Sequence, residues 1–170
     1  HYAHTSHGQQ LLTGIDLIEQ TNATFNQTAE DTNLNPEPDA LNIFNGQDNG
    51  AYAETYVTPD LYWETPTGLD MTRYVLNHFP INISMWMWCT QLDYFDNASV
   101  DNYLANMTVL EGEFPGVTFV YMTGNAQMEG AEGFNRHQNN ERIRQYCITN
   151  NKWLFDFADI DAWNGPEEHM

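Results

Sequence analysis

The chain has 170 residues, the length of a single domain, and 41% of them are hydrophobic, which is enough for a core and excludes wholesale disorder. Asp and Glu number 24 against 5 Lys and Arg, so the formal net charge at pH 7 is −19. Such a charge repels phosphate groups and disfavours nucleic acids and anionic membrane surfaces as partners, whereas it favours cations such as calcium. No apolar run approaches the ~18 residues that a membrane span requires.

The N-terminal part of the chain is expected to hold a strand, a helix and a long insertion. A short strand is expected over residues 1–7. After Gly8 the helical spacing of apolar residues predicts an amphipathic helix with a buried stripe of Leu11, Leu12, Ile15 and Ile18. Residues 21–66 are rich in Asn, Thr, Asp and Pro, and we interpret them as an irregular insertion with short strands near 41–44 and 51–57. Loops of this length, when ordered, are usually functional.

The C-terminal part predicts alternating helices and strands. The strongest strand signals are apolar at both odd and even positions, as is typical of parallel strands covered on both faces, and they span 81–88, 117–122 and 153–158. Helices are expected between these strands and before them: over 67–77, from a cap at Ser99 to Phe114-Pro115-Gly116, and over about 134–150. This alternation predicts one α/β domain over 1–170, with a parallel sheet between helix layers.

Several short motifs lie at or near the ends of the predicted strands. They are His-Thr-Ser-His-Gly at 4–8, Trp-Met-Trp-Cys-Thr-Gln at 86–91, Phe-Val-Tyr-Met-Thr-Gly at 119–124, Arg-Gln-Tyr-Cys at 144–147 and Leu-Phe-Asp-Phe-Ala-Asp-Ile at 154–160. Together they resemble a group of secreted bacterial and archaeal proteins related to the SGNH (GDSL-like) hydrolases. The resemblance covers most of the chain except 21–66. It implies a flavodoxin-like three-layer sandwich with a parallel sheet and a long irregular insertion.

In SGNH hydrolases a nucleophilic serine follows the first strand, and a glycine and an asparagine on later loops help to form the oxyanion hole. Carried over by position, the resemblance implies Ser6 as the nucleophile. Gly124 and Asn125 match the Gly-x-Asn-Asp block loosely, without its spacing or its Asp, and imply Asn125 in the oxyanion hole. A serine that follows the first strand has a plainer alternative role, in which its side-chain oxygen caps the next helix.

The third part of the family's triad is an Asp-x-x-His block near the C-terminus, and this chain departs from it. Residues 159–162 read Asp-Ile-Asp-Ala, with no His three residues after the Asp. A serine without its base keeps its proton at neutral pH and is a poor nucleophile. The hypothesis that this chain is a hydrolase therefore requires His7 or His137 to replace the missing histidine.

Five Asn-x-Ser/Thr sequons and a start at His1 rather than Met favour a secreted, N-glycosylated, extracellular or cell-surface chain, although chance supplies some sequons in an Asn- and Thr-rich sequence. Asn82 falls inside a predicted central strand and is expected to stay bare. The sites expected to face solvent and carry glycans are Asn22, Asn26, Asn97 and Asn106.

Cys89 and Cys147 are expected to form a disulfide in an oxidising compartment, the alternative being two unrelated buried thiols.

Oxygen-bearing side chains at every second position suggest a calcium loop formed by Asp31, Asn33, Asn35, Glu37 and Asp39. It is not an EF-hand, because Pro36 replaces the turn glycine and Asn42 replaces the glutamate at the twelfth position. A looser calcium site and a solvated acidic loop remain the two interpretations. Copper ligation by His1, His4 and His7 is disfavoured, since residues 4 and 7 of a strand point to opposite faces.

These observations lead to two hypotheses of different classes. The first is an extracellular glycoprotein on a catalytically incomplete SGNH-like fold, which associates with copies of itself as a surface-layer or filament subunit. The second is a secreted carbohydrate esterase that uses Ser6. A glycan-binding module, with Trp86 or Trp88 stacking on sugars rather than packing in the core, is a third and weaker idea. Fold analogy alone does not choose among them.

Overall fold

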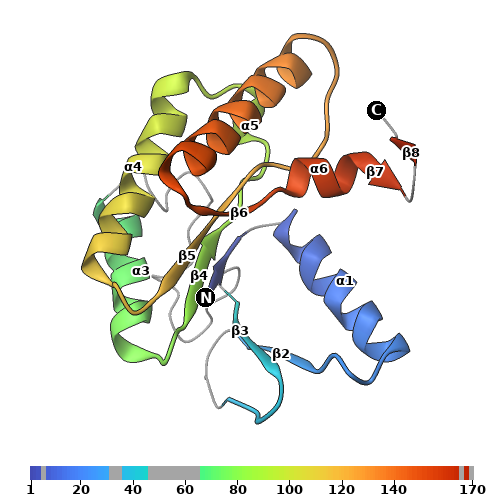
Figure 1. The fold of residues 1–170 in the computed structure, drawn as a ribbon, viewed down its shortest axis with the longest axis vertical. Helices are drawn as coiled ribbons and strands as arrows, with labels where there is room; N and C mark the ends of the chain where they lie inside the picture. The colour runs from blue at the N-terminus through green and yellow to red at the C-terminus, as the bar shows by residue number, and fades with distance from the viewer. Residues whose placement is uncertain (5–6, 31–35, 46–65, 165–166, 169–170) are drawn as a thin grey trace.

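A computed structural model describes residues 1–4, 7–30, 36–45, 66–164 and 167–168 of the chain. This part contains a four-stranded sheet whose neighbouring strands all run parallel (Figure 1). The strand order is β1 (Tyr2–Ala3), β4 (Ile83–Trp86), β5 (Thr118–Met122) and β6 (Trp153–Phe155). The predicted α/β fold with a parallel sheet is therefore confirmed.

Five helices accompany the sheet in the described residues: α1 (Gly8–Thr21), α3 (Pro66–His78), α4 (Asn97–Glu113), α5 (Gly130–Asn150) and α6 (Phe157–Ala162). A 3₁₀ turn, η2 (Gln91–Asp93), precedes α4, and a short antiparallel pair, β7 (Trp163–Asn164) and β8 (Glu167–Glu168), follows α6. None of the helices in the described residues is both long enough and apolar enough to cross a membrane.

A second, two-stranded parallel sheet lies between α1 and α3 in the sequence and joins β2 (Gln27–Glu30) to β3 (Leu41–Phe44). The strand predicted over 41–44 is thereby confirmed, and the one predicted over 51–57 lies outside the described residues. After β3 the chain forms a parallel bridge between Asn45 and Tyr2 of β1. The end of this segment therefore runs alongside the free edge of the main sheet.

Two predicted boundaries are wrong for the same physical reason, which is a carboxylate that caps a helix. The strand predicted over 153–158 ends at Phe155, because Asp156 turns the chain into α6 and its Oδ1 accepts a hydrogen bond from the Asp159 N–H at 3.4 Å. Asp96, rather than Ser99, caps α4, and its Oδ1 accepts from both the N–H and the hydroxyl of Ser99 at 2.9 Å.

The two faces of the sheet are covered unequally. On one face, side chains of α3, α4 and α5 pack against fully buried strand residues such as Trp86, Phe119 and Tyr121. On the other face, a smaller cluster joins Tyr2, Met87 and Met122 to residues of α1, β3 and α6. The sequence predicts strands covered on both faces, but the described residues cover this second face only in part, because a groove remains between α1 and the sheet.

Candidate functional site

The carboxyl ends of the parallel strands form the first candidate site, because open α/β sheets bind ligands at this edge. Ser6, the nucleophile implied by the resemblance, lies outside the described residues. His7 immediately precedes α1, and Cys89 follows β4. Nδ1 of His7 lies 2.9 Å from Sγ of Cys89, within hydrogen-bonding distance, and both residues are half-buried. The structure thus brings together a histidine and a thiol that sequence reasoning considered separately.

Asn125 and His137 lie in different environments. Asn125 is buried beside the guanidinium of Arg136, whose Nη1 donates to the Asn125 backbone oxygen at 3.1 Å and to its Oδ1 at 3.3 Å. The Asn125 amide donates in turn to Oε1 of Gln127 at 3.0 Å. His137, next in sequence to Arg136, is exposed on α5. The Asn125 side chain is therefore engaged in internal contacts that hold the loop after β5.

The side chain of Arg136 contacts several residues at the carboxyl edge of the sheet. Its side chain is 2% exposed, forms an ion pair with the buried carboxylate of Asp93, and donates from Nη2 to the Cys89 backbone oxygen at 2.8 Å. A methyl group on Gly124 would lie 2.4 Å from Nη1 of Arg136, so this approach requires glycine at 124. One side chain of α5 thereby fixes the loops that follow β4 and β5.

Sequence reasoning missed this cluster, although a signal for it exists. Four polar residues of α5 are buried or half-buried at helical spacing: Asn135, Arg136, Asn139 and Asn140. The side-chain amide of Asn139 donates to backbone oxygens of the loop before α4, and Oδ1 of Asn140 accepts from the Gly124 N–H at 2.9 Å. A polar stripe on the inward face of a predicted helix indicates that the helix binds loops as well as the sheet.

A second ion pair lies where β6 ends. Nε of Arg144 donates to Oδ2 of Asp156 at 2.6 Å, and the hydroxyl of Thr123 donates to Oδ1 at 2.8 Å. Partial burial alone would raise the pKa of Asp156, but the hydrogen bonds from Arg144 and Thr123 outweigh it and hold the pKa below its usual value. The Asp156 carboxylate therefore ties together β5, β6 and α5.

The predicted disulfide is wrong: neither Cys89 nor Cys147 is disulfide-bonded. Cys89 lies beyond the carboxyl end of β4, whereas Cys147 lies in the last turns of α5, just before the amino end of β6. These positions are at opposite ends of the parallel strands. Cys147 is a buried thiol packed in the larger core cluster, and burial raises its pKa to about 12.

Three of the four predicted glycosylation sites, Asn22, Asn26 and Asn97, are exposed. Asn106 is half-buried on α4, where its amide donates to Oδ1 of Asn102 at 3.2 Å. The reason for expecting a bare Asn82 is wrong, because this residue lies just before β4 and is exposed. The four expected sites and the bare Asn82 all remain predictions.

Most of the predicted calcium loop, namely Asp31, Asn33 and Asn35, lies outside the described residues. Glu37 and Asp39 are exposed. The side chain of Asn42 is bound to the backbone of this turn, accepting from the Glu37 N–H at 2.7 Å and donating to the Glu37 oxygen at 3.0 Å. Among the described residues no group of three His, Cys, Asp or Glu side chains is placed to hold a metal ion.

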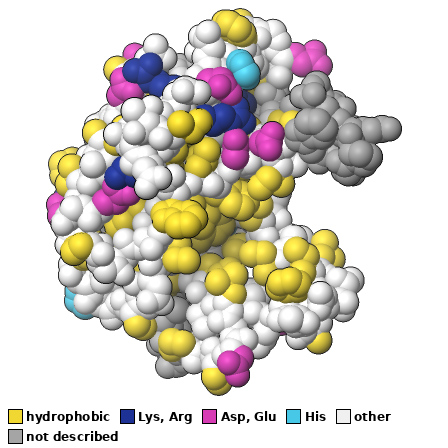
Figure 2. All heavy atoms as spheres, in the orientation of Figure 1, with side chains coloured by type: hydrophobic (Ala, Val, Ile, Leu, Met, Phe, Trp, Pro, Cys, Tyr) yellow, Lys and Arg dark blue, Asp and Glu magenta, His cyan; other side chains and the backbone are white. Residues whose placement is uncertain are grey.

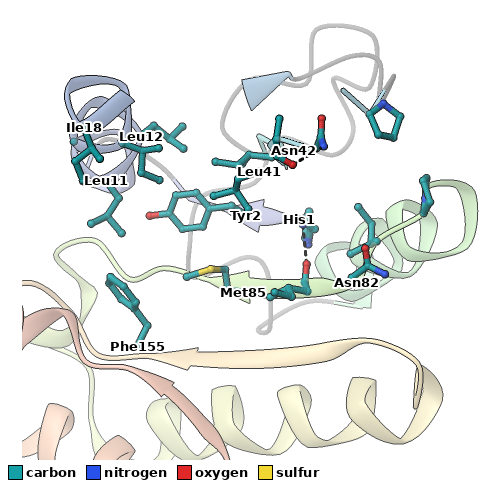
Figure 3. Close-up of a pocket in the computed structure, with 18 of the residues that line it drawn as sticks. His1, Tyr2, Leu11, Leu12, Ile18, Leu41, Asn42, Asn82, Met85 and Phe155 are labelled. Carbon is teal, nitrogen blue, oxygen red and sulfur yellow. Dashed lines mark hydrogen bonds between the residues drawn. The ribbon is translucent and has the colours of Figure 1, made fainter. Parts of the chain in front are cut away.

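The second candidate site is a groove of about 750 Å³ over the partly covered face of the sheet. Figure 2 shows hydrophobic side chains gathered around this hollow. In Figure 3, Leu11 and Leu12 of α1 lie on one side of the groove, and Met85 and Phe155 of the sheet lie on the other. None of the described residues that line it is an Asp, Glu, Lys or Arg. Sequence reasoning missed the groove, because strands apolar on both faces do not reveal which face lacks a helix.

The groove continues into exposed apolar residues of the same sheet face. Ile83 and Met85 alternate with inward-facing residues of β4, and Ile83 is 49% exposed. Trp153 and Phe155 stand two residues apart on the edge strand β6, and Trp153 is 71% exposed. We refer to the groove together with Ile83, Met85, Trp153 and Phe155 as the open apolar face.

Comparisons with known proteins found no match to this chain among protein-family models, curated proteins or solved structures.

Proposed function

We propose that this chain is an extracellular, N-glycosylated structural protein that associates with copies of itself as a surface-layer or filament subunit. The open apolar face is the contact surface in this proposal. The observation that carries it is a parallel sheet with one apolar face only partly covered. Parallel sheets are almost always covered on both faces, so a second layer is expected there.

The charge of the molecule favours this face over any other for contact between copies. A net charge of −19 opposes association between identical chains. Because the described residues that line the groove include no Asp or Glu, copies that meet there do not bring carboxylates of these residues together. Contact between the open apolar face of one copy and a different surface of the next is heterologous, and a heterologous contact that does not close into a ring yields a filament.

The finer fold assignment is part of the same proposal: a flavodoxin-like, SGNH-like three-layer sandwich without a complete triad. The bridge between Asn45 and Tyr2 places the chain after β3 beside β1, on the side away from β4. Read in chain order, this arrangement resembles the flavodoxin-like strand order 2-1-3-4-5. The C-terminal block still lacks a histidine at Ala162.

Matched substitutions of two exposed isoleucines test the proposal. Ile83→Glu places a carboxylate on the open apolar face. Ile148→Glu places one on α5, away from that face, at a residue that is 72% exposed. Burying an isoleucine is worth roughly 1.5–3 kcal/mol, so Ile83→Glu is expected to weaken association about 10- to 100-fold and Ile148→Glu to leave it unchanged. Light scattering and electron microscopy provide the measurement. Monomers at high concentration, or equal effects of both substitutions, would contradict it.

The alternative is a secreted carbohydrate esterase with Ser6 as its nucleophile. It is favoured by one observation, the half-buried imidazole of His7 at the carboxyl edge of the sheet. The expected result is release of acetate from acetylated sugars that disappears in Ser6→Ala. Retention of that activity in Ser6→Ala would remove Ser6 as the nucleophile.

A further inference from the structure

We propose that Cys89 and His7 form a nucleophilic thiol site that accepts an acyl group from an activated ester. This site lies at the carboxyl edge of the sheet and is independent of the open apolar face. Its chemistry belongs to neither the structural function nor the Ser6 esterase. The proposal rests on a thiol and an imidazole held within hydrogen-bonding distance where α/β folds bind their ligands.

The thiol of Cys89 and the imidazole of His7 lie in hydrogen-bonding geometry. Nδ1 of His7 and Sγ of Cys89 are 2.9 Å apart, and this is the arrangement in which an imidazole takes the proton of a thiol. The two residues come from segments 82 positions apart in the sequence, so the fold creates the pair. Both residues are half-buried, so neither is fully enclosed in the core.

The backbone of Cys89 is held by hydrogen bonds on both sides. The Cys89 N–H donates to Oε1 of Gln91 at 2.9 Å, and the Cys89 backbone oxygen accepts from Nη2 of Arg136 at 2.8 Å. Arg136 is itself fixed by its buried ion pair with Asp93. A side chain whose backbone is bound on both sides keeps its position while its sulfur reacts, as a preorganised site requires.

The second cysteine of the chain, Cys147, provides a comparison for Cys89. Cys147 is buried in the core, and its thiol pKa is raised to about 12, so it stays protonated at neutral pH. Thiolates rather than thiols are nucleophiles, and they occur in partly exposed sites beside histidine or cationic groups. Cys89 stands in such a site, and Cys147 serves as the matched unreactive thiol.

The reaction is balanced without a cofactor. The thiol proton of Cys89 passes to Nδ1 of His7, and the sulfur electron pair forms a bond to the carbonyl carbon of the ester. The C–O bond of the ester then breaks, and the departing alkoxide takes the proton from the imidazolium. The products are a thioester on Cys89, a free alcohol and a neutral His7.

The first experiment measures alkylation of each cysteine by iodoacetamide, with peptide mass spectrometry, between about pH 5 and pH 9. At neutral pH we expect Cys89 to react at least ~10-fold faster than both Cys147 and free glutathione. His7→Gln is expected to slow Cys89 roughly 10-fold and to remove the histidine limb of its pH profile. His78→Gln, at an exposed histidine of α3, is the matched control and is expected to change neither.

The second experiment uses p-nitrophenyl acetate as the acyl donor. We expect a burst of p-nitrophenol and an acetyl group on Cys89, lost in Cys89→Ser and retained in Ser6→Ala. A burst lost in Ser6→Ala and retained in Cys89→Ser would overturn the thiol site and support the esterase. No burst, or a Cys89 alkylation rate unaffected by His7→Gln in a variant with unchanged circular dichroism, would overturn it as well. Association between copies is measured separately, so failure here leaves the proposed structural function standing.

Discussion

At the scale of single residues, the ion pair between Arg136 and Asp93 is the one among the described residues in which both side chains are buried. Both side chains are almost fully buried, and Arg136 also satisfies backbone oxygens of Cys89 and Asn125. Removing one partner of such a pair leaves the other as an uncompensated charge, which costs far more than the intact pair contributes. The loops at the carboxyl edge therefore depend on both residues together.

We predict that Asp93→Ala lowers the free energy of unfolding by about 3–5 kcal/mol, because it leaves the Arg136 guanidinium buried without its carboxylate. The matched control is Asp101→Ala, which breaks the exposed pair between Asp101 and Arg142 and should cost less than ~1 kcal/mol. Urea unfolding measures both. Equal losses in the two variants would show that the Arg136 site is solvated.

The pair between His7 and Cys89 shows why site residues at this scale elude sequence analysis. The sequence suggests His7 only as a substitute base and Cys89 only as half of a disulfide. The bond to Cys147 fails because α5 runs back across the sheet and carries Cys147 to the amino end of the strands. Contacts between loops depend on strand order and register, which a single sequence does not specify.

At the scale of elements, the regular structure was largely predictable and its boundaries were less so. The helical spacing of apolar residues identified α1, and continuous apolar runs identified the strands β4 and β5, because burial enforces both patterns. The boundary errors arose at polar residues that form local hydrogen bonds. Asp96 and Asp156 cap helices, and Asn42 binds the turn before it, as short polar side chains do where regular structure ends.

The carboxylate of Asp156 makes the junction of β5, β6 and α5 sensitive to acid. Because its pKa is lowered in the folded state, the carboxylate stabilises the fold at pH values above its unfolded pKa of about 3.9. That stability is lost as the pH falls through the lower folded value. The contacts responsible are the hydrogen bonds from Arg144 and Thr123.

We predict that Asp156→Asn destabilises the protein at neutral pH, and that the difference from the unsubstituted chain shrinks as the pH is lowered below about 4. Asp39→Asn, on an exposed turn, is the control and should open no such difference. Urea unfolding at a series of pH values measures the effect. A difference that stays constant down to about pH 3 would show that the contacts do not depend on the Asp156 charge.

At the scale of the whole molecule, sequence and structure differ most over the second face of the sheet. Strands apolar on both sides correctly predicted a parallel sheet. They also predicted a helix layer over each face, but among the described residues α1, β3 and the short α6 cover the second one only in part, and a groove of about 750 Å³ lies between α1 and the sheet. An apolar pattern predicts that a sheet face is buried, but it does not show whether the residues that bury it belong to the same chain or to another.

The dependence of association on salt distinguishes the proposed apolar contact from ionic ones. A chain of charge −19 repels its copies at low ionic strength, and salt screens that repulsion while leaving apolar burial in force. We therefore predict that raising sodium chloride from about 0.05 M to about 0.5 M strengthens association at least several-fold. Analytical ultracentrifugation at fixed protein concentration measures it, with Ile83→Glu as the variant expected to gain little. Assemblies that dissolve in salt, or on addition of a chelator, would instead be held by ion pairs or bridging calcium, and the open apolar face would not be their contact.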